Sequence, residues 1–220
     1  MERPEYRVYG DKLREFCWFC WFYRSLILLQ NPLFSNTFSL KGVLEFCKSM
    51  FCVLCVFCVY TESVNNFFKF AVAVVGCELV GILATPFTLS AIPDWYSILS
   101  KPAFSPPNWV FGPAWTMLYF FMGTSAFLIW QKGLKKRMVK EALFYFLAQL
   151  FFNFIWSVLF FGLRSPILGL IDILVLWVLI LITTIKFYKL SKPASYLLIP
   201  YLAWVSFAAI LNLSIVFLNP

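Results

Sequence analysis

The chain of 220 residues contains no histidine, and charged residues make up only 13% of it. Without imidazole it lacks the commonest general base, the commonest metal ligand and the usual proximal haem ligand. It also lacks a nucleotide-binding glycine motif. The scarcity of charge is far from the roughly one quarter typical of soluble domains. These absences speak against ordinary hydrolytic or redox catalysis and predict a membrane protein.

The formal net charge is +8, yet no basic run lies in polar surroundings. Nucleic-acid binding needs an exposed basic surface, whereas these lysines fall between apolar segments. We therefore expect no nucleic-acid partner and interpret the lysines as signals of membrane topology.

Aromatic residues are abundant, with 27 Phe, 10 Tyr and 9 Trp. Lipid contact alone does not require so many rings, because Leu, Ile and Val serve it equally well. Many of the rings will be packing or interfacial residues. The excess nevertheless favours a site for a flat, mainly apolar ligand.

Five stretches are long enough to cross the hydrocarbon core of a bilayer, which takes about 20 apolar residues. Backbone polar groups cannot stay unpaired in lipid, so such unbroken apolar runs must be helical. Their short connections favour antiparallel neighbours. We predict an all-α membrane protein in which residues 66–220 form one bundle of five transmembrane helices. The expected spans are Phe67–Ala91, Trp109–Trp130, Ala142–Gly162, Pro166–Ile185 and Ala194–Leu218.

The connecting loops differ in charge. The loops after the second and fourth spans are rich in basic residues, whereas the opposite loops carry only Lys101 and Arg164. The positive-inside rule places the basic loops in the cytoplasm and the C-terminus outside. We expect an integral protein of a bacterial inner membrane. The basic residues are Lys132, Lys135, Lys136, Arg137, Lys140, Lys186, Lys189 and Lys192.

Residues 1–65 differ from the rest and contain six of the seven cysteines. Cys52, Cys55 and Cys58 have a spacing seen in iron–sulfur ligation, but apolar neighbours leave no polar turn to present the thiolates, so we expect no metal site. An extra helix, an uncleaved signal-like anchor and an extension without a role in the bundle all remain open. We favour the extension and expect it to be dispensable for the bundle.

Three predicted helices each have a face that combines rings with polar groups. In the second span, Phe111, Trp115, Tyr119 and Met122 follow helical spacing and form one stripe. A pocket for a flat ligand with a few polar edges needs such faces, although helix packing through the same residues is the simpler alternative. The other two faces hold Asn153, Trp156 and Phe160, and Tyr201, Trp204, Ala208, Leu211 and Asn212.

Two carboxyl groups, Glu78 and Asp172, lie within predicted spans. Ionisable groups in a membrane are costly and are functional candidates by default. Both lie near helix ends and neither has an evident titratable partner for proton transfer. We therefore expect structural roles for them.

Several separated motifs occur in a characteristic order. Trp95–Pro102 and Pro106–Trp115 precede Asn153–Ser157, Asp172 and Pro200–Trp204. Together they resemble the tryptophan-rich sensory protein and translocator protein family, in its first loop and in its second, third, fourth and fifth helices. The resemblance covers residues 67 to 220.

The resemblance implies a membrane protein that binds porphyrins, such as protoporphyrin IX or haem, as ligands, without an obligatory cofactor. It implies that the proline-rich first loop covers the outer mouth of the pocket, and it leaves a homodimer open. The implied ligand-binding residues are Trp95, Tyr96, Pro107, Phe111, Trp115, Tyr119, Asn153, Trp156, Trp204, Ala208 and Leu211.

Two other functions stay open. Resemblance to bacterial members allows a light- or oxidant-dependent enzyme that degrades porphyrin, in which Trp115 and Trp204 would be catalytic. A small-molecule or sterol transporter is the third, but the chain shows no inverted repeat. Lys186–Leu190 fits an inverted cholesterol motif, which is a weak pattern, and no basic residue follows Tyr201 to complete the forward motif.

Overall fold

The computed structural model describes residues 66–219 and is all-helical over that range, without strands. The expectations for residues 1–65, including those for the cysteine run, lie outside the described residues. Five long helices carry the fold, and two of them continue into a short π-helical turn. The helices are α4 (Asn66–Ala91), α5 (Asn108–Trp130), α6 (Arg137–Ser157), α7 (Pro166–Leu190) and α8 (Lys192–Leu218), and the π turns are η2 (Ile92–Tyr96) and η3 (Val158–Gly162).

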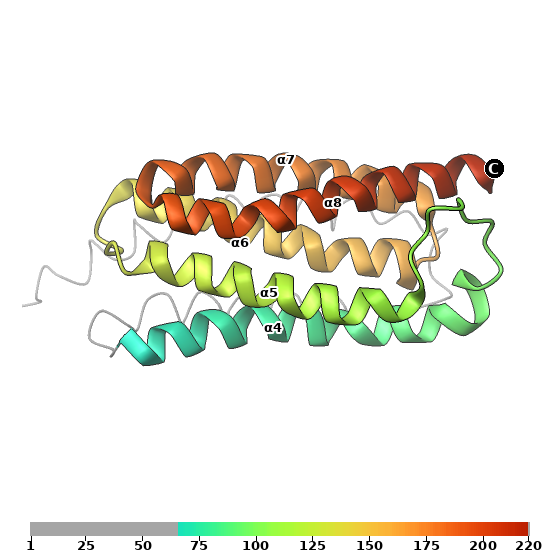
Figure 1. Cartoon of the computed structure of the whole chain (residues 1–220), viewed down its shortest axis with the longest axis horizontal. Coiled ribbons are helices and arrows are strands. Elements are labelled where there is room, and N and C mark those ends of the chain that lie inside the picture. Colours follow the sequence, from blue (N-terminus) through green and yellow to red (C-terminus); the bar gives the residue numbers. More distant parts are fainter. Residues whose placement is uncertain (1–65, 220) are drawn as a thin grey trace, which may run out of the picture. The chain divides into compact units, whose positions relative to one another are not determined.

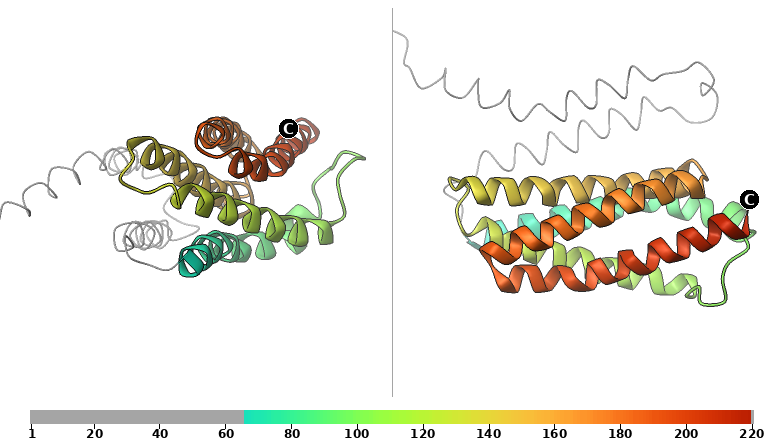
Figure 2. Two further views of the ribbon diagram at one scale, coloured as in Figure 1. Left: turned by 60° about the vertical axis from the view of Figure 1, so that its left-hand side comes forward. Right: turned by 90° about the horizontal axis from the view of Figure 1, so that it is seen from above.

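The helices run side by side along one axis (Figure 1). The packing order differs from the chain order: α4 packs on α5, α5 on α8, α8 on α7 and α7 on α6, while α6 returns to α4. This order closes a ring. Figure 2 shows the same helices in an oblique view and from above. A space enclosed by such a ring can be lined by several helices at once.

The two ends of this bundle differ. At one end, which we call the lid end, lie residues 97–107 and the end of α8 (Figure 1). At the opposite end, the lysine end, lie the α5–α6 loop and the α7–α8 junction. The structure thus places both lysine-rich loops at the same end, as the charge pattern predicted.

Two helices extend beyond the apolar runs that predicted them. Helix α6 begins at Arg137 instead of Ala142, and α7 ends at Leu190 instead of Ile185. The apolar run marks the part of a helix that lipid can cover, whereas the helix itself continues where charged side chains reach water. Lys186 Nζ on α7 lies 2.7 Å from Glu141 Oε1 on α6 and links the two extensions.

Helices α4 and α5 approach each other closely near the lysine end. A Cβ atom on Gly123 would lie 2.5 Å from the Cα of Val74, so only glycine permits this packing. Phe70 packs edge-on against Phe127 in the same region, with ring centroids 5.3 Å apart. These contacts pack α4 and α5 tightly together in the half of the bundle near the lysine end.

Within residues 66–219, four segments are long and apolar enough to cross a membrane: α4 with η2, α6 with η3, α7 and α8. Helix α5 is 23 residues long and contains no charged residue. It is not among those four segments, and it carries Asn108, Gly112, Pro113, Thr116, three Trp and one Tyr. Many of these α5 residues line the cavity described next.

Candidate ligand pocket

A cavity of about 420 Å³ lies inside the ring of helices, in its lid half. Its walls come from α4, η2, α5, α6, η3 and α8, and α7 contributes none of them. The two π turns lie at this end, where each replaces the last turn of an α-helix. They position Tyr96 and Phe160 in the wall, which agrees with the frequent occurrence of π turns at functional sites.

Nine of the eleven predicted ligand-binding residues line this one cavity, although they come from four separate segments of the chain. Their contact with a ligand stays a prediction, but their convergence is a property of the fold. The nine are Tyr96, Phe111, Trp115, Tyr119, Asn153, Trp156, Trp204, Ala208 and Leu211.

The other two predicted residues, Trp95 and Pro107, are not part of the cavity wall. Trp95 packs edge-on against Phe160, with ring centroids 5.5 Å apart. Phe160 itself lines the cavity, so Trp95 supports the wall from behind. Pro107 is the exposed residue immediately before α5.

A chain of buried hydrogen bonds forms the floor of the cavity. The Tyr119 hydroxyl donates to Asn153 Oδ1, and Asn153 Nδ2 donates to the Tyr201 hydroxyl at 3.1 Å. Tyr201 in turn donates to Gln149 Oε1 at 2.8 Å. These bonds orient the Asn153 amide and use one of its two N–H groups.

Aromatic rings form much of the wall above this floor. Trp156 stacks on Phe160, with centroids 5.1 Å apart and planes inclined by 16°. Trp204 on α8 meets Phe111 on α5 edge-on at 6.0 Å. Trp115 lies lower, 5.6 Å from the Tyr119 ring. Ring faces from three helices therefore border the same space.

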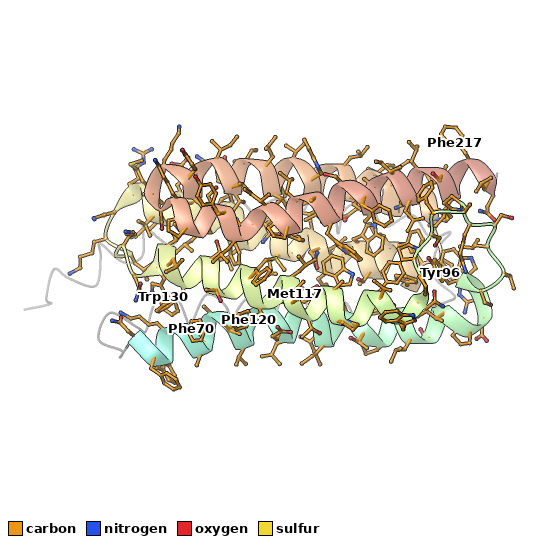
Figure 3. All side chains as sticks on the ribbon, viewed as in Figure 1. Phe70, Tyr96, Met117, Phe120, Trp130 and Phe217 are labelled. Carbon is orange, nitrogen blue, oxygen red and sulfur yellow. The ribbon has the colours of Figure 1, made fainter. Side chains whose placement is uncertain are left out.

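Residues 97–107, which we call the lid loop, are tied to the end of α8. Asn219 Oδ1 accepts from the backbone N–H of Ser100, and its Nδ2 donates to the Ser100 carbonyl, both at 3.0 Å. Tyr96, at the start of this loop, is only 5% exposed and lies at the lid end of the bundle (Figure 3). The side-chain amide thus ties residues 97–107 to the end of α8.

The cavity is open on its side, between α4 and α5. Three of its large apolar lining residues are largely exposed: Ile82 (60%) and Leu89 (63%) on α4, and Trp109 (75%) on α5. In a membrane these side chains would face lipid. The wall is therefore incomplete between α4 and α5, on the lid side of their close contact at Gly123 and Val74.

The contribution of α4 was missed from the sequence, because no aromatic face marks this helix. Gly81, Thr85 and Thr88 line the cavity together with Glu78. Small residues at helical spacing were the available signal, since they create room on one face. A Cβ on Gly81 would lie 2.4 Å from the Tyr119 ring, so this position must lack a side chain.

Asp172, the second intramembrane carboxyl, does not line the cavity. It is 5% exposed, and its Oδ2 has no hydrogen-bond partner among the described residues. The Asn212 amide on α8 bonds to α7, donating to the carbonyl of Pro166 at 3.0 Å and accepting from the N–H of Leu170 at 3.1 Å. Asn212 lines the cavity, whereas Asp172 lies outside it.

Within residues 66–219, no three cysteine or acidic side chains are grouped so that they could hold a metal ion. The cavity instead offers ring faces, a polar floor and an opening toward the lipid phase. Fold and site together define a helical membrane protein with an internal pocket lined by many aromatic side chains.

Comparison with known proteins gives this class its name. The chain belongs to the TspO/MBR family, whose characteristic sequence matches residues 73–218. It is 45% identical over 144 residues to the tryptophan-rich protein TspO of Chlorobaculum tepidum, covering 66% of this chain and 91% of that one. It is 42% identical over 154 residues to the tryptophan-rich protein TspO of Archaeoglobus fulgidus, covering 70% and 99%. The translocator protein of Bos taurus is 38% identical over 137 residues, covering 61% and 80%.

Proposed function

We propose that this protein binds tetrapyrroles, such as protoporphyrin IX or haem, or similar flat apolar ligands, and acts in their sensing, regulation or carriage. The observation that supports this most is the convergence of Trp115, Trp156 and Trp204 on one cavity with the Asn153 amide at its floor. Its volume of about 420 Å³ lies within the usual range for small-molecule sites.

The proposed ligand lies between the indoles of Trp115 and Trp204, which approach from α5 and α8. An aromatic pair adds about 0.5–1.5 kcal/mol beyond the area it buries. The second N–H of Asn153 meets a polar edge of the ligand. Since the chain has no histidine, haem is held here through its ring faces and not by an axial imidazole.

In the membrane we propose that α5 is a fifth span beside the other four. Several of its polar and aromatic residues, such as Asn108, Trp115 and Tyr119, line the cavity, so their presence does not remove this helix from the bilayer. We further propose that the lysine end is cytoplasmic and that the lid end and C-terminus are outside, in a bacterial inner membrane. The eight basic residues at the lysine end support this orientation.

The test is a titration of the purified protein in detergent with protoporphyrin IX, haem and a sterol, followed by quenching of tryptophan fluorescence. Trp115→Leu and Trp204→Leu should each weaken porphyrin binding several-fold, because leucine keeps apolar bulk but loses the ring. The matched control is Trp130→Leu, since Trp130 lies at the lysine end, outside the cavity (Figure 3).

Equal porphyrin affinity in wild type and in the Trp115→Leu, Trp204→Leu double variant would contradict the pocket assignment. Tighter binding of the sterol than of either tetrapyrrole would instead favour sterol carriage. Loss of affinity in the Trp130→Leu control would show that the effect is general and not local to the pocket.

A second function is favoured by the position of two indoles on one cavity. In it the protein degrades porphyrin in a light- or oxidant-dependent reaction, with Trp115 or Trp204 supplying an electron. Phenylalanine at these positions should then preserve most binding but slow degradation, because a benzene ring is much harder to oxidise than indole. Absorbance of bound protoporphyrin under illumination in air measures this, and a stable spectrum in wild type would leave binding as the function.

A further inference from the structure

One lining residue of the pocket is charged, and it is an acid. Glu78 on α4 borders the cavity, whereas no Lys or Arg does so. The natural expectation for a pocket that binds porphyrin carboxylates is a basic lining. The charge of this pocket therefore carries information about the ligand that its shape does not.

Glu78 lies at the deep end of the cavity, next to the polar floor. It precedes Gly81 by three positions, and residues at that spacing share a helix face. Gly81 lies against the Tyr119 ring, and Tyr119 begins the hydrogen-bond chain of the floor. The Glu78 side chain is half-buried there, on the α4 side of the opening between α4 and α5.

The Glu78 carboxyl makes no hydrogen bond or ion pair with any residue between 66 and 219. An ionisable group without a partner is expensive within a membrane, and native proteins usually supply one. Glu141 shows the contrast: it lies at the lysine end and is paired with Lys186 at 2.7 Å. Glu78 has no such partner among residues 66–219, and it borders the cavity, where a ligand could provide one.

The opposite end of the cavity has a cation nearby. Lys101 in the lid loop holds its Nζ over the Tyr96 ring, 4.2 Å from the centroid. Tyr96 lines the cavity, so Lys101 contacts a wall residue without lining the cavity itself. The pocket consequently has an acidic deep end and a basic lid end.

We propose that Glu78 determines the charge preference of the pocket, which selects flat apolar ligands with a cationic or hydrogen-bond-donating group directed at the deep end. The inference rests on the proposed function in that the cavity must bind a ligand. A tetrapyrrole in this pocket binds with its carboxylates toward Lys101 and its apolar edge toward Glu78. A carboxylate at the deep end is rejected by like-charge repulsion.

Three pyrene derivatives that differ in charge test this independently of tetrapyrroles: 1-pyrenemethylamine, 1-pyrenemethanol and 1-pyrenecarboxylate. Binding to the full chain in detergent is measured by quenching of tryptophan fluorescence at neutral pH. In wild type we expect the amine to bind about tenfold more tightly than the carboxylate, which is a difference of about 1.4 kcal/mol. The alcohol should fall between them.

Glu78→Gln should bring the three affinities to within about twofold of one another, whereas Glu78→Asp should keep the order. The matched control is Glu141→Gln, which changes net charge equally but lies at the lysine end, and it should behave as wild type. The inference is overturned by equal affinities in wild type, by an unchanged order in Glu78→Gln, or by failure of all three probes to bind.

A porphyrin comparison separates this inference from the proposed function. Protoporphyrin IX and its dimethyl ester are titrated into wild type and Glu78→Gln. Pyrene binding with the expected order but no porphyrin binding would refute the tetrapyrrole proposal and retain the role of Glu78. If porphyrin binds but Glu78→Gln leaves the order of the pyrene affinities unchanged, the tetrapyrrole proposal is retained and the role of Glu78 is refuted.

Discussion

The buried hydroxyl of Tyr201 offers the sharpest test of the pocket floor. It accepts a hydrogen bond from Asn153 on α6 and donates one to Gln149 on the same helix, so it joins α8 to α6. Tyr201 is 0% exposed and does not line the cavity. Tyr201→Phe therefore removes two hydrogen bonds while leaving the ligand space and the ring packing intact.

The expected loss of stability follows from those two bonds. Interhelical hydrogen bonds in membrane proteins contribute about 0.6 kcal/mol on average and at most about 1.7. Leaving a buried donor or acceptor unsatisfied costs about 1–3 kcal/mol. Since Asn153 Nδ2 loses one acceptor and Gln149 Oε1 loses its donor, we expect Tyr201→Phe to lower the free energy of unfolding by about 1–3 kcal/mol.

Ligand binding should also respond, because Tyr201 orients the Asn153 amide. We expect a several-fold loss of affinity for a ligand with a polar edge and little change for a purely apolar one. Unfolding by increasing SDS in mixed micelles measures stability, and tryptophan quenching measures binding. Tyr196→Phe is the control on the same helix, because Tyr196 is 55% exposed and its hydroxyl makes no hydrogen bond with the described residues.

The outcome that would refute this reasoning is specific. A Tyr201→Phe protein that unfolds with wild-type stability and binds polar-edged ligands equally well would mean that the floor network does not orient Asn153. Equal destabilisation of Tyr196→Phe would show that the assay responds to any lost hydroxyl on α8.

Three further predictions concern packing, the lid and topology. Gly123→Ala should destabilise the protein by about 1–3 kcal/mol, since its Cβ meets the α4 backbone, whereas Gly76→Ala, with nothing within 4 Å, should be neutral in the same SDS titration. Asn219→Ala should release the lid loop and speed ligand dissociation several-fold in stopped-flow quenching; an unchanged rate would contradict the clasp. A membrane-impermeant thiol reagent should label Ser105→Cys but not Lys135→Cys in intact cells, and the opposite pattern would invert the proposed topology.

Much of the fold was predictable because the bilayer imposes it. Apolar runs of spanning length must be helical, and the starts of α4 and α5 were predicted to within one residue, at Phe67 and Trp109. The ends at Arg137 and Leu190 were not, because charged residues hide the continuation of a helix into water. An apolar run therefore indicates the part of a helix that lies in lipid, and the helix can be longer than that part.

Residues on one helix face could be grouped from spacing alone, as for Trp115 and Tyr119, because the helical repeat is local. Which faces of different helices meet is another matter. A helix in lipid is apolar on its outer and inner sides alike, so the amphipathic signal that orients a soluble helix is weak. The part that α4 plays in the pocket, with Glu78 and Gly81, therefore required the tertiary structure.

The sequence by itself determined the all-helical class, the ring-rich faces, the shared end of the lysine loops and the family. Only the tertiary structure decided that Trp95 supports the wall from behind Phe160, that Asn219 clasps Ser100 from 119 residues away, and that the cavity opens between α4 and α5. Each of these depends on contacts between segments far apart in the chain. Such contacts depend on how the helices rotate and separate, which neither spacing nor composition records.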